Sequence, residues 1–178
     1  MEQGMGDLES RIASHTATVG IVGLGYVGLP LVFAFIEKDF HVLGVDIDAR
    51  KIAHLEAGES YIKHLPASSI QSVNATGRFR CTTDFARLAD ADAILMCIPT
   101  PLTVNREPDM TYIVATAEAC APHLRRGQLV VLESTTYPGT SDEVLVPLLE
   151  KGSGLKSGED FLVAYSPERE DPGNPFFS

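Results

Sequence analysis

The stretch Thr18–Leu31 reads TVGIVGLGYVGLPL and carries the signal that decides the fold. Its first part, Thr18–Val22, is a β-branched apolar run, which is typical of a strand buried on both faces of a parallel sheet. The glycines at 23, 25 and 28 then form a GxGxxG pattern at the start of a bulky apolar segment, 25–38, that favours a helix. A glycine-rich turn between a strand and a helix is the arrangement that binds the pyrophosphate of a dinucleotide.

Each position of this pattern has a physical role. Gly23 allows the tight turn, Gly25 lets the backbone approach the pyrophosphate, and Gly28 lets the helix lie close to the strand. The next predicted strand, 41–46, ends at Asp46, whose carboxylate can accept hydrogen bonds from a ribose diol. A 2′-phosphate would meet that negative charge at short range, so the pattern favours NAD over NADP. The alternative is that the glycines only make a turn and Asp46 only caps the segment after it.

Predicted strands and helices alternate along the whole chain. After the first two strands, four more are expected, at 79–82, 93–98, 129–132 and 161–164. This alternation predicts a single-domain α/β fold, a Rossmann-like doubly wound parallel sheet with right-handed crossovers. Residues 1–16 are expected to be an N-terminal extension, and residues 17–178 the NAD-binding domain.

Polar or proline-containing segments follow three of the predicted strands, at 98–102, 133–136 and 166–168. Ligands of doubly wound sheets bind beyond the carboxyl ends of the strands. We therefore expect these three exits to converge on one edge of the sheet. Ordinary loop chemistry explains any one exit, whereas the coincidence of three favours a ligand site.

The composition fits one compact domain and argues against several classes of protein. The chain has 178 residues, 44% of them hydrophobic, and a net charge of -10. The acidic balance argues against nucleic acid as a partner, because phosphate backbones are bound by Lys and Arg patches. Cys81, Cys97 and Cys120 are widely spaced and form no CxxC, so buried thiols are expected rather than disulfides or a metal site. The chain has no apolar signal-peptide core and no run near the roughly 20 residues of a membrane span, so a cytoplasmic location is expected.

Six short segments of the chain, taken together and in this order, are far more specific for a protein family than any one of them alone. They are GLGYVGLPL (Gly23–Leu31), VDID (Val45–Asp48), SYI (Ser60–Ile62), IPTPL (Ile98–Leu102), ESTTYPGT (Glu133–Thr140) and YSPEREDPGN (Tyr165–Asn174). With these segments the chain resembles the N-terminal domain of the UDP-glucose/GDP-mannose dehydrogenase family over nearly its whole length. The last two segments look most like the branch that oxidises UDP-N-acetylglucosamine or similar UDP-N-acetylhexosamines.

The resemblance implies an activity. Members of this family oxidise the C6 alcohol of a UDP-sugar to the uronic acid by two successive hydride transfers to NAD, through a thioester on a cysteine that is then hydrolysed. For the full-length protein the resemblance implies a homodimer or larger assembly, a UDP-sugar as substrate and a place in polysaccharide biosynthesis. The identity of the sugar, UDP-N-acetylhexosamine or UDP-glucose, stays open.

The resemblance also implies roles for individual residues. Thr135 is expected beside the nicotinamide and the substrate, and Glu168 is expected to assist hydrolysis as an acid/base group. Taken without the resemblance, Thr135 is more simply a strand-end cap and Glu168 a solvated loop carboxylate. Lys51 or Arg50 is expected to reach the cofactor ribose or phosphate, and Thr100 and Leu102 its adenosine side. The cofactor-binding residues predicted in full are Gly23, Gly25, Tyr26, Val27, Gly28, Asp46, Lys51, Thr100, Leu102 and Thr135.

The family's nucleophilic cysteine lies in a glycine-rich segment of a later domain. None of the three cysteines here has the flanking glycine and proline pattern of that segment. The chain is therefore expected to be part of a longer enzyme and to bind NAD without turnover by itself. Two alternatives stay open: another Rossmann dehydrogenase, of the 6-phosphogluconate or hydroxyacid type, and a non-catalytic NAD-sensing module.

Overall fold

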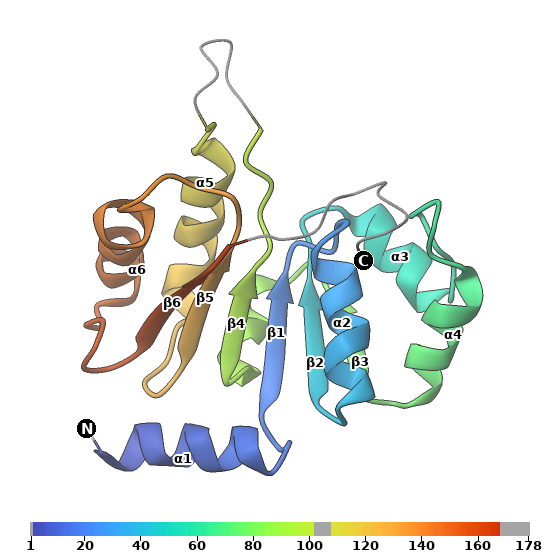
Figure 1. Ribbon diagram of the computed structural model, residues 1–178, viewed down its shortest axis with the longest axis horizontal. Helices are drawn as coiled ribbons and strands as arrows, with labels where there is room; N and C mark the ends of the chain where they lie inside the picture. The colour runs from blue at the N-terminus through green and yellow to red at the C-terminus, as the bar shows by residue number, and fades with distance from the viewer. Residues whose placement is uncertain (1, 102–107, 168–178) are drawn as a thin grey trace.

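The computed structural model describes residues 2–101 and 108–167, and its centre is one six-stranded parallel sheet (Figure 1). The strand order is β3-β2-β1-β4-β5-β6, which runs outward from β1 on both sides. This is the doubly wound topology that the sequence predicts. The strands are β1 (Thr18–Val22), β2 (His41–Val45), β3 (Phe79–Thr82), β4 (Ala93–Met96), β5 (Leu129–Glu133) and β6 (Leu162–Ser166).

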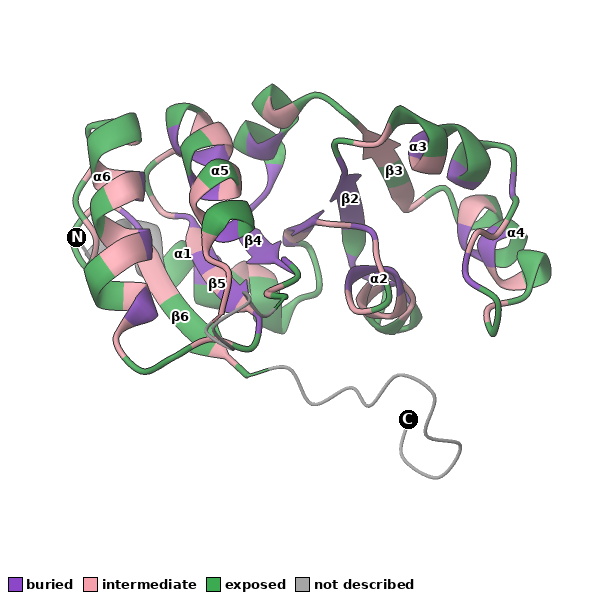
Figure 2. Cartoon of the chain, turned by 90° about the horizontal axis from the view of Figure 1, so that it is seen from above, coloured by how far each residue is buried: buried purple, intermediate pink, exposed green. Residues whose placement is uncertain are grey.

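Helices cover both faces of the sheet. Figure 2 shows α5 and α6 on one side of the sheet and α2 on the other. The α-helices are α1 (Glu2–Ala13), α2 (Gly28–Glu37), α3 (Ala49–Glu56), α4 (Ala67–Ala75), α5 (Thr111–Cys120) and α6 (Val146–Ser153). Three shorter turns of helix are η1 (Phe85–Asp90), η2 (Ala121–His123) and η3 (Thr140–Leu145).

Each face of the sheet has its own hydrophobic cluster, because successive side chains of a strand point to opposite faces. Val19 and Ile21 of β1 belong to the cluster under α2, as does Leu95 of β4. Ile94 and Met96 of β4 belong to the cluster under α5 and α6. The central strands are thus buried on both faces, which is why their sequences are continuous apolar runs rather than alternating ones.

The strand register brings the carboxyl ends of four strands level. Val22 at the end of β1 pairs with Val45 of β2 and with Met96 of β4, and Met96 pairs with Leu132 of β5. The segments that leave β2, β1, β4 and β5 therefore start side by side at one edge. Thr100 and Thr135, the predicted residues of these exits that the structure describes, lie at this edge.

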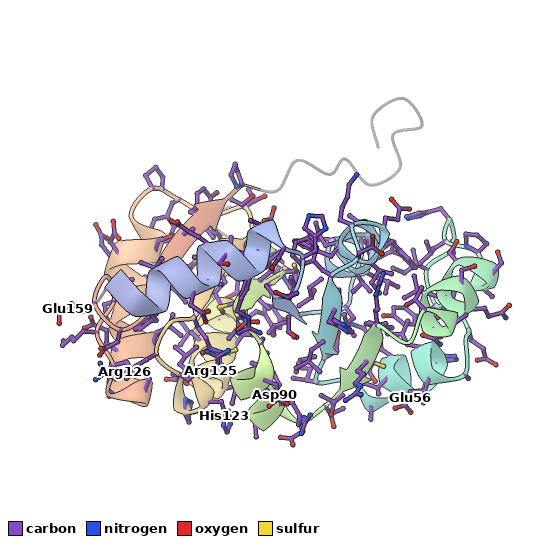
Figure 3. All side chains as sticks on the ribbon, turned by 90° about the horizontal axis from the view of Figure 1, so that it is seen from below. Glu56, Asp90, His123, Arg125, Arg126 and Glu159 are labelled. Carbon is purple, nitrogen blue, oxygen red and sulfur yellow. The ribbon has the colours of Figure 1, made fainter. Side chains whose placement is uncertain are left out.

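The opposite edge is closed by α1, which crosses the amino ends of the strands (Figures 1 and 3). Leu8 of α1 is buried, and Arg11 Nη1 lies 2.5 Å from Asp92 Oδ1. Asp92, only 2% exposed, also accepts from Arg125 Nη2 at 2.7 Å and from the amide of Thr18 at 2.8 Å. The extension expected over residues 1–16 thus contains a helix that is attached to the sheet through one buried carboxylate.

The chain between β5 and β6 forms a π-helical turn, η3, followed by α6, and Pro147 lies in the first turn of α6. A first-turn amide has no partner within its helix, so the missing N–H of proline has little effect there. The segment between α3 and β3 contains the helix α4. Within the described ranges, no helix has the length and apolar character needed to cross a bilayer.

Candidate functional site

A cavity of about 490 Å³ lies at the carboxyl edge of the sheet and runs from the exit of β2 to the exit of β5. Its volume falls in the range of about 300–1,000 Å³ typical of small-molecule sites. Nine of the cofactor-binding residues predicted from sequence fall in the described ranges, and all but Gly28 line the cavity. Its walls are Val22, Gly23, Gly25, Tyr26, Val27, Val45, Asp46, Ile47, Lys51, Phe85, Cys97, Ile98, Pro99, Thr100, Tyr112, Thr116, Glu133, Ser134 and Thr135.

The three glycines of the turn meet three different environments. Gly23 has a φ of +93°, and a Cβ there would lie 2.4 Å from the carbonyl oxygen of Cys97. A Cβ on Gly28 would lie 1.9 Å from the carbonyl oxygen of Gly23, so only glycine lets α2 start so close to β1. A Cβ on Gly25 would meet nothing within 4 Å. Gly25 therefore has no internal packing reason to be glycine, and the space beside it opens into the cavity.

The amino end of α2 lies beside this space, because its N-cap residue, Val27, lines the cavity. Val27 is the N-cap residue, and its side chain makes no capping hydrogen bond. No other described side chain accepts a hydrogen bond from the first amides of α2. Helix N-termini carry unsatisfied N–H groups and a partial positive charge, which together bind anions such as phosphate. An uncapped N-terminus beside an open glycine is the geometry expected for a pyrophosphate site.

Asp46 follows β2 and holds the glycine turn in place. Its side chain is 5% exposed, and Oδ2 accepts from the amide of Leu24 at 2.8 Å and from Lys51 Nζ at 2.7 Å. Oδ1 accepts from the amide of Asp48 at 2.9 Å. A carboxylate offers about four acceptor positions, so the contacts from described residues leave about one, on Oδ1. The residue predicted as a ribose ligand thus also connects the turn to the first residues after β2.

Lys51 and Arg50 are neighbours in sequence with different positions. Lys51 lines the cavity and forms an ion pair with Asp46. Arg50 is exposed and forms an ion pair with Asp48 at 2.8 Å. Hydrogen bonds from Arg50 lower the pKa of Asp48 to about 2, and one of them, from the Arg50 amide, caps the start of α3. Of the two cations considered from sequence, only Lys51 is placed at the cavity.

Sequence reasoning missed the apolar wall of the cavity. Ile47 is 82% exposed although it follows a buried strand, and Phe85 and Tyr112 line the same cavity from η1 and α5. An isoleucine so exposed at a cavity rim provides a flat apolar surface for a ring. The only signal in the sequence was an apolar residue between two aspartates in VDID, which by itself does not distinguish a wall from a loop.

Hydrogen bonds join the strand exits that were expected to converge. Thr100 Oγ1 donates to the carbonyl of Thr135 at 2.6 Å, and buried Ser134 donates to the carbonyl of Ile98 at 2.7 Å. Ser166 Oγ donates to Glu133 Oε1 at 3.0 Å, which brings the exit of β6 to the exit of β5. The convergence is therefore present for all three exits as far as Pro167. Thr100 and Thr135 are thus neighbours. The roles of Thr100 at the adenosine half of the cofactor and of Thr135 at the nicotinamide stay predictions.

Two predicted site residues, Leu102 and Glu168, lie outside the described residues. Within the ranges that are described, no group of three His, Cys, Asp or Glu side chains is placed to hold a metal ion. The described site therefore offers backbone amides, the buried carboxylate of Asp46 with Lys51, the partly buried carboxylate of Glu133, threonine hydroxyls and an apolar wall.

Comparison with known proteins agrees with this geometry. Residues 17–177 match the model of the UDP-glucose/GDP-mannose dehydrogenase family, NAD binding domain. The chain is 38% identical over 156 residues to the UDP-N-acetyl-D-glucosamine 6-dehydrogenase of Pseudomonas aeruginosa, covering 88% of this chain and 36% of that protein. It is 38% identical over 164 residues to the UDP-N-acetyl-D-mannosamine dehydrogenase of Escherichia coli (strain K12), covering 88% of this chain and 38% of that one.

A solved structure shows the same likeness in three dimensions. The NDP-N-acetyl-D-galactosaminuronic acid dehydrogenase of Methanosarcina mazei Go1 superposes with a TM-score of 0.82 at 36% identity, covering 92% of this chain and 37% of that one. The chain thus spans little more than a third of the length of the relatives it matches.

Proposed function

The chain belongs to the UDP-glucose/GDP-mannose dehydrogenase family, whose NAD-binding domain it forms, and we propose that its cavity holds one extended NAD molecule from the exit of β2 to the exit of β5. The observation that carries this proposal is the pairing of an open glycine and an uncapped helix start with a buried aspartate on the neighbouring strand. These groups match the phosphates and the ribose diol of a dinucleotide.

The adenosine half is proposed to lie at the exit of β2. The remaining acceptor position of Asp46 would take one ribose hydroxyl, and Lys51, which donates to the same carboxylate, would donate to the ribose or the adjacent phosphate. Ile47 and Tyr112 would contact the adenine ring with their exposed apolar surfaces. The charged pair and the apolar wall therefore supply the two kinds of contact that an adenosine needs.

The nicotinamide half is proposed to lie at the exits of β4 and β5. The Thr100–Thr135 bond and the buried Ser134–Ile98 bond hold these two exits together and so fix the wall against which the ring would lie. A fixed wall favours hydride transfer, because the reacting atoms must be held close and in line. Thr135 is proposed to lie beside the nicotinamide, and Glu168, beyond the described residues, to assist hydrolysis.

For the whole protein we propose oxidation of the C6 alcohol of a UDP-sugar. Two hydrides pass to two NAD molecules, and one water supplies the second oxygen of the acid product. UDP-N-acetylglucosamine and UDP-N-acetylmannosamine are the first substrates to test, because the named relatives act on these sugars. Turnover is proposed to need groups that this chain does not supply, and a non-catalytic NAD sensor is the alternative.

Calorimetric titration of the purified chain tests the cofactor proposal. We expect saturable binding of NAD at a single site, and NADP binding weaker by at least about tenfold, because a 2′-phosphate beside Asp46 puts like charges in contact. Absence of NAD binding, or equal affinity for the two cofactors, would contradict the proposed pose. In the full-length protein, Glu168→Gln should slow NADH formation from the UDP-sugar, whereas an NAD sensor would not depend on that carboxylate.

Substituting Asp46→Asn is expected to reduce the preference for NAD. The change removes the negative charge and releases Lys51 to meet a 2′-phosphate, while one acceptor oxygen remains. We expect NAD to bind about fivefold more weakly and the ratio of NAD to NADP affinity to fall by about tenfold. Parallel titrations with both cofactors measure the ratio.

Asp48→Asn is the matched control for this substitution. Asp48 carries the same charge two residues away, pairs with Arg50 and does not line the cavity. Asparagine is as good an N-cap as aspartate, so α3 should be unaffected. The two affinities should therefore match those of the unmodified chain, and a change in the NAD to NADP ratio equal to that of the Asp46 variant would argue against a specific role for Asp46.

A further inference from the structure

The segment Ser60–Ile62, one of the six segments quoted from the sequence, lies outside the cavity wall but contacts the glycine turn. Ser60 Oγ accepts from the amide of Ile62 at 3.2 Å and donates to the Ile62 carbonyl at 3.1 Å, which makes a local turn. Ile62 is buried in the cluster under α2 and anchors that turn. Between them, the half-buried Tyr61 directs its hydroxyl to the carbonyl oxygen of Leu24 at 2.6 Å.

Leu24 is thereby held at both of its backbone polar groups. Its amide donates to Asp46 at 2.8 Å and its carbonyl accepts from Tyr61. Its side chain is fully buried against Gly44, where a Cβ would lie 2.9 Å from Leu24 Cδ2. Two side chains from different segments of the chain therefore fix this one residue of the turn.

The bond to Tyr61 fixes more than Leu24. The Leu24 carbonyl belongs to the peptide unit that it shares with Gly25, and this peptide is trans, as are all those described. In a planar trans peptide the C=O and the N–H point in opposite directions. Fixing the carbonyl toward Tyr61 therefore fixes the Gly25 amide in the opposite direction, and Gly25 lines the cavity. Among the described residues the structure records no acceptor for this amide.

We propose that Tyr61 is a positioning residue for dinucleotide binding, which orients the Gly25 amide toward the pyrophosphate through the Leu24–Gly25 peptide. The proposal rests on the NAD site described above. Tyr61 itself does not line the cavity, so its effect passes through the turn. Burial, together with the charge of Asp46, raises the pKa of the Tyr61 phenol, so the hydroxyl stays a donor throughout the neutral pH range.

The test is Tyr61→Phe, which keeps the packed ring and removes only the hydroxyl. We expect NAD and ADP-ribose, which both carry the pyrophosphate, to bind about three- to tenfold more weakly. Adenosine, which has the same base and ribose but no phosphate, should bind with unchanged affinity when its titration is followed by NMR. Tyr165→Phe is the control, because this exposed phenol on β6 lies outside the cavity wall.

The outcomes distinguish the positioning role of Tyr61 from the NAD site itself. Unchanged NAD affinity in Tyr61→Phe, or an equal loss for adenosine, overturns the positioning role while the NAD site stands. If the unmodified chain does not bind NAD, the site itself is overturned, and the positioning role with it. A second measurement needs no variant: in the unmodified chain the Gly25 amide resonance should shift on titration with ADP-ribose and not with adenosine, and the same shift with both overturns the role.

Discussion

Gly28→Ala is expected to unfold or strongly destabilise the chain, whereas Gly25→Ala is expected to leave it folded and to remove most of its NAD affinity. The added Cβ at position 28 would lie 1.9 Å from the Gly23 carbonyl oxygen, a backbone atom that cannot move without displacing the turn. We expect a loss of at least about 3 kcal/mol in the free energy of unfolding, at the upper end for overpacking. Urea unfolding followed by circular dichroism measures this loss.

At Gly25 the added methyl group meets no protein atom within 4 Å, and the φ of this residue does not lie in the left-handed region. The stability of the chain should therefore change little or increase slightly. The methyl group would instead occupy the space proposed for the pyrophosphate, and NAD affinity should fall by about a hundredfold. Calorimetric titration of this variant isolates the loss of binding from any loss of folding.

Gly6→Ala, in α1, is the control for both variants. Gly6 also has open space around it, but it lies at the opposite edge of the sheet from the cavity. We expect unchanged NAD affinity and stability raised by up to about 1 kcal/mol, because alanine favours a helix. Normal NAD binding by Gly25→Ala would show that the phosphates lie elsewhere.

Asp92→Ala is expected to cost about 3 kcal/mol of folding stability without changing the affinity for NAD. The carboxylate is 2% exposed and receives hydrogen bonds from Arg11, Arg125 and the Thr18 amide. Breaking a buried ion pair costs about 3–5 kcal/mol when it leaves a buried charge unpaired. Here both arginines are more than a third exposed, so water compensates part of the loss and the lower end applies. Thermal unfolding should show a melting temperature lower by roughly 6–12 °C.

Arg11→Ala separates the contribution of α1 from that of the rest of the Asp92 contacts. It removes one of the three donors to Asp92 and leaves Arg125 and Thr18 in place. We therefore expect the free energy of unfolding to fall by about 1 kcal/mol. A loss as large as that of Asp92→Ala would mean that the docking of α1, rather than the buried carboxylate, supports this edge. A change of NAD affinity in either variant would mean that the two edges of the sheet are coupled.

The fold was predictable because its signals are local. The strand Thr18–Val22, the turn after it and Asp46 after the next strand can each be recognised from a few neighbouring residues. The alternation of strands and helices predicts the doubly wound parallel sheet, whereas the strand order comes from the structure. The convergence of the strand exits followed from topology alone, since parallel strands end at a common edge. These expectations needed no knowledge of which side chains meet.

The remaining features of the site depend on contacts between distant residues. Nothing in the sequence distinguishes Lys51 from Arg50, because the separation of the two depends on how α3 is rotated relative to Asp46. The bond between Tyr61 and Leu24 joins residues 37 apart and has no periodic signal. In the sequence, Ile47 resembles the last apolar residue of a buried strand. The structure shows instead that its side chain is exposed at the cavity.

The position of α1 also decides how the molecule can be attached to a surface. α1 lies at the amino ends of the strands, and the cavity opens at their carboxyl ends. A tether or fluorophore on an exposed α1 residue such as Glu9 would lie at the end of the molecule opposite the cavity. Cys97 and Cys120 are buried, and burial raises the pKa of Cys81 to about 11 and that of Cys120 to about 12. A thiol introduced at Glu9 would therefore react ahead of the native ones, and an immobilised sensor made in this way would present its open side to the solution.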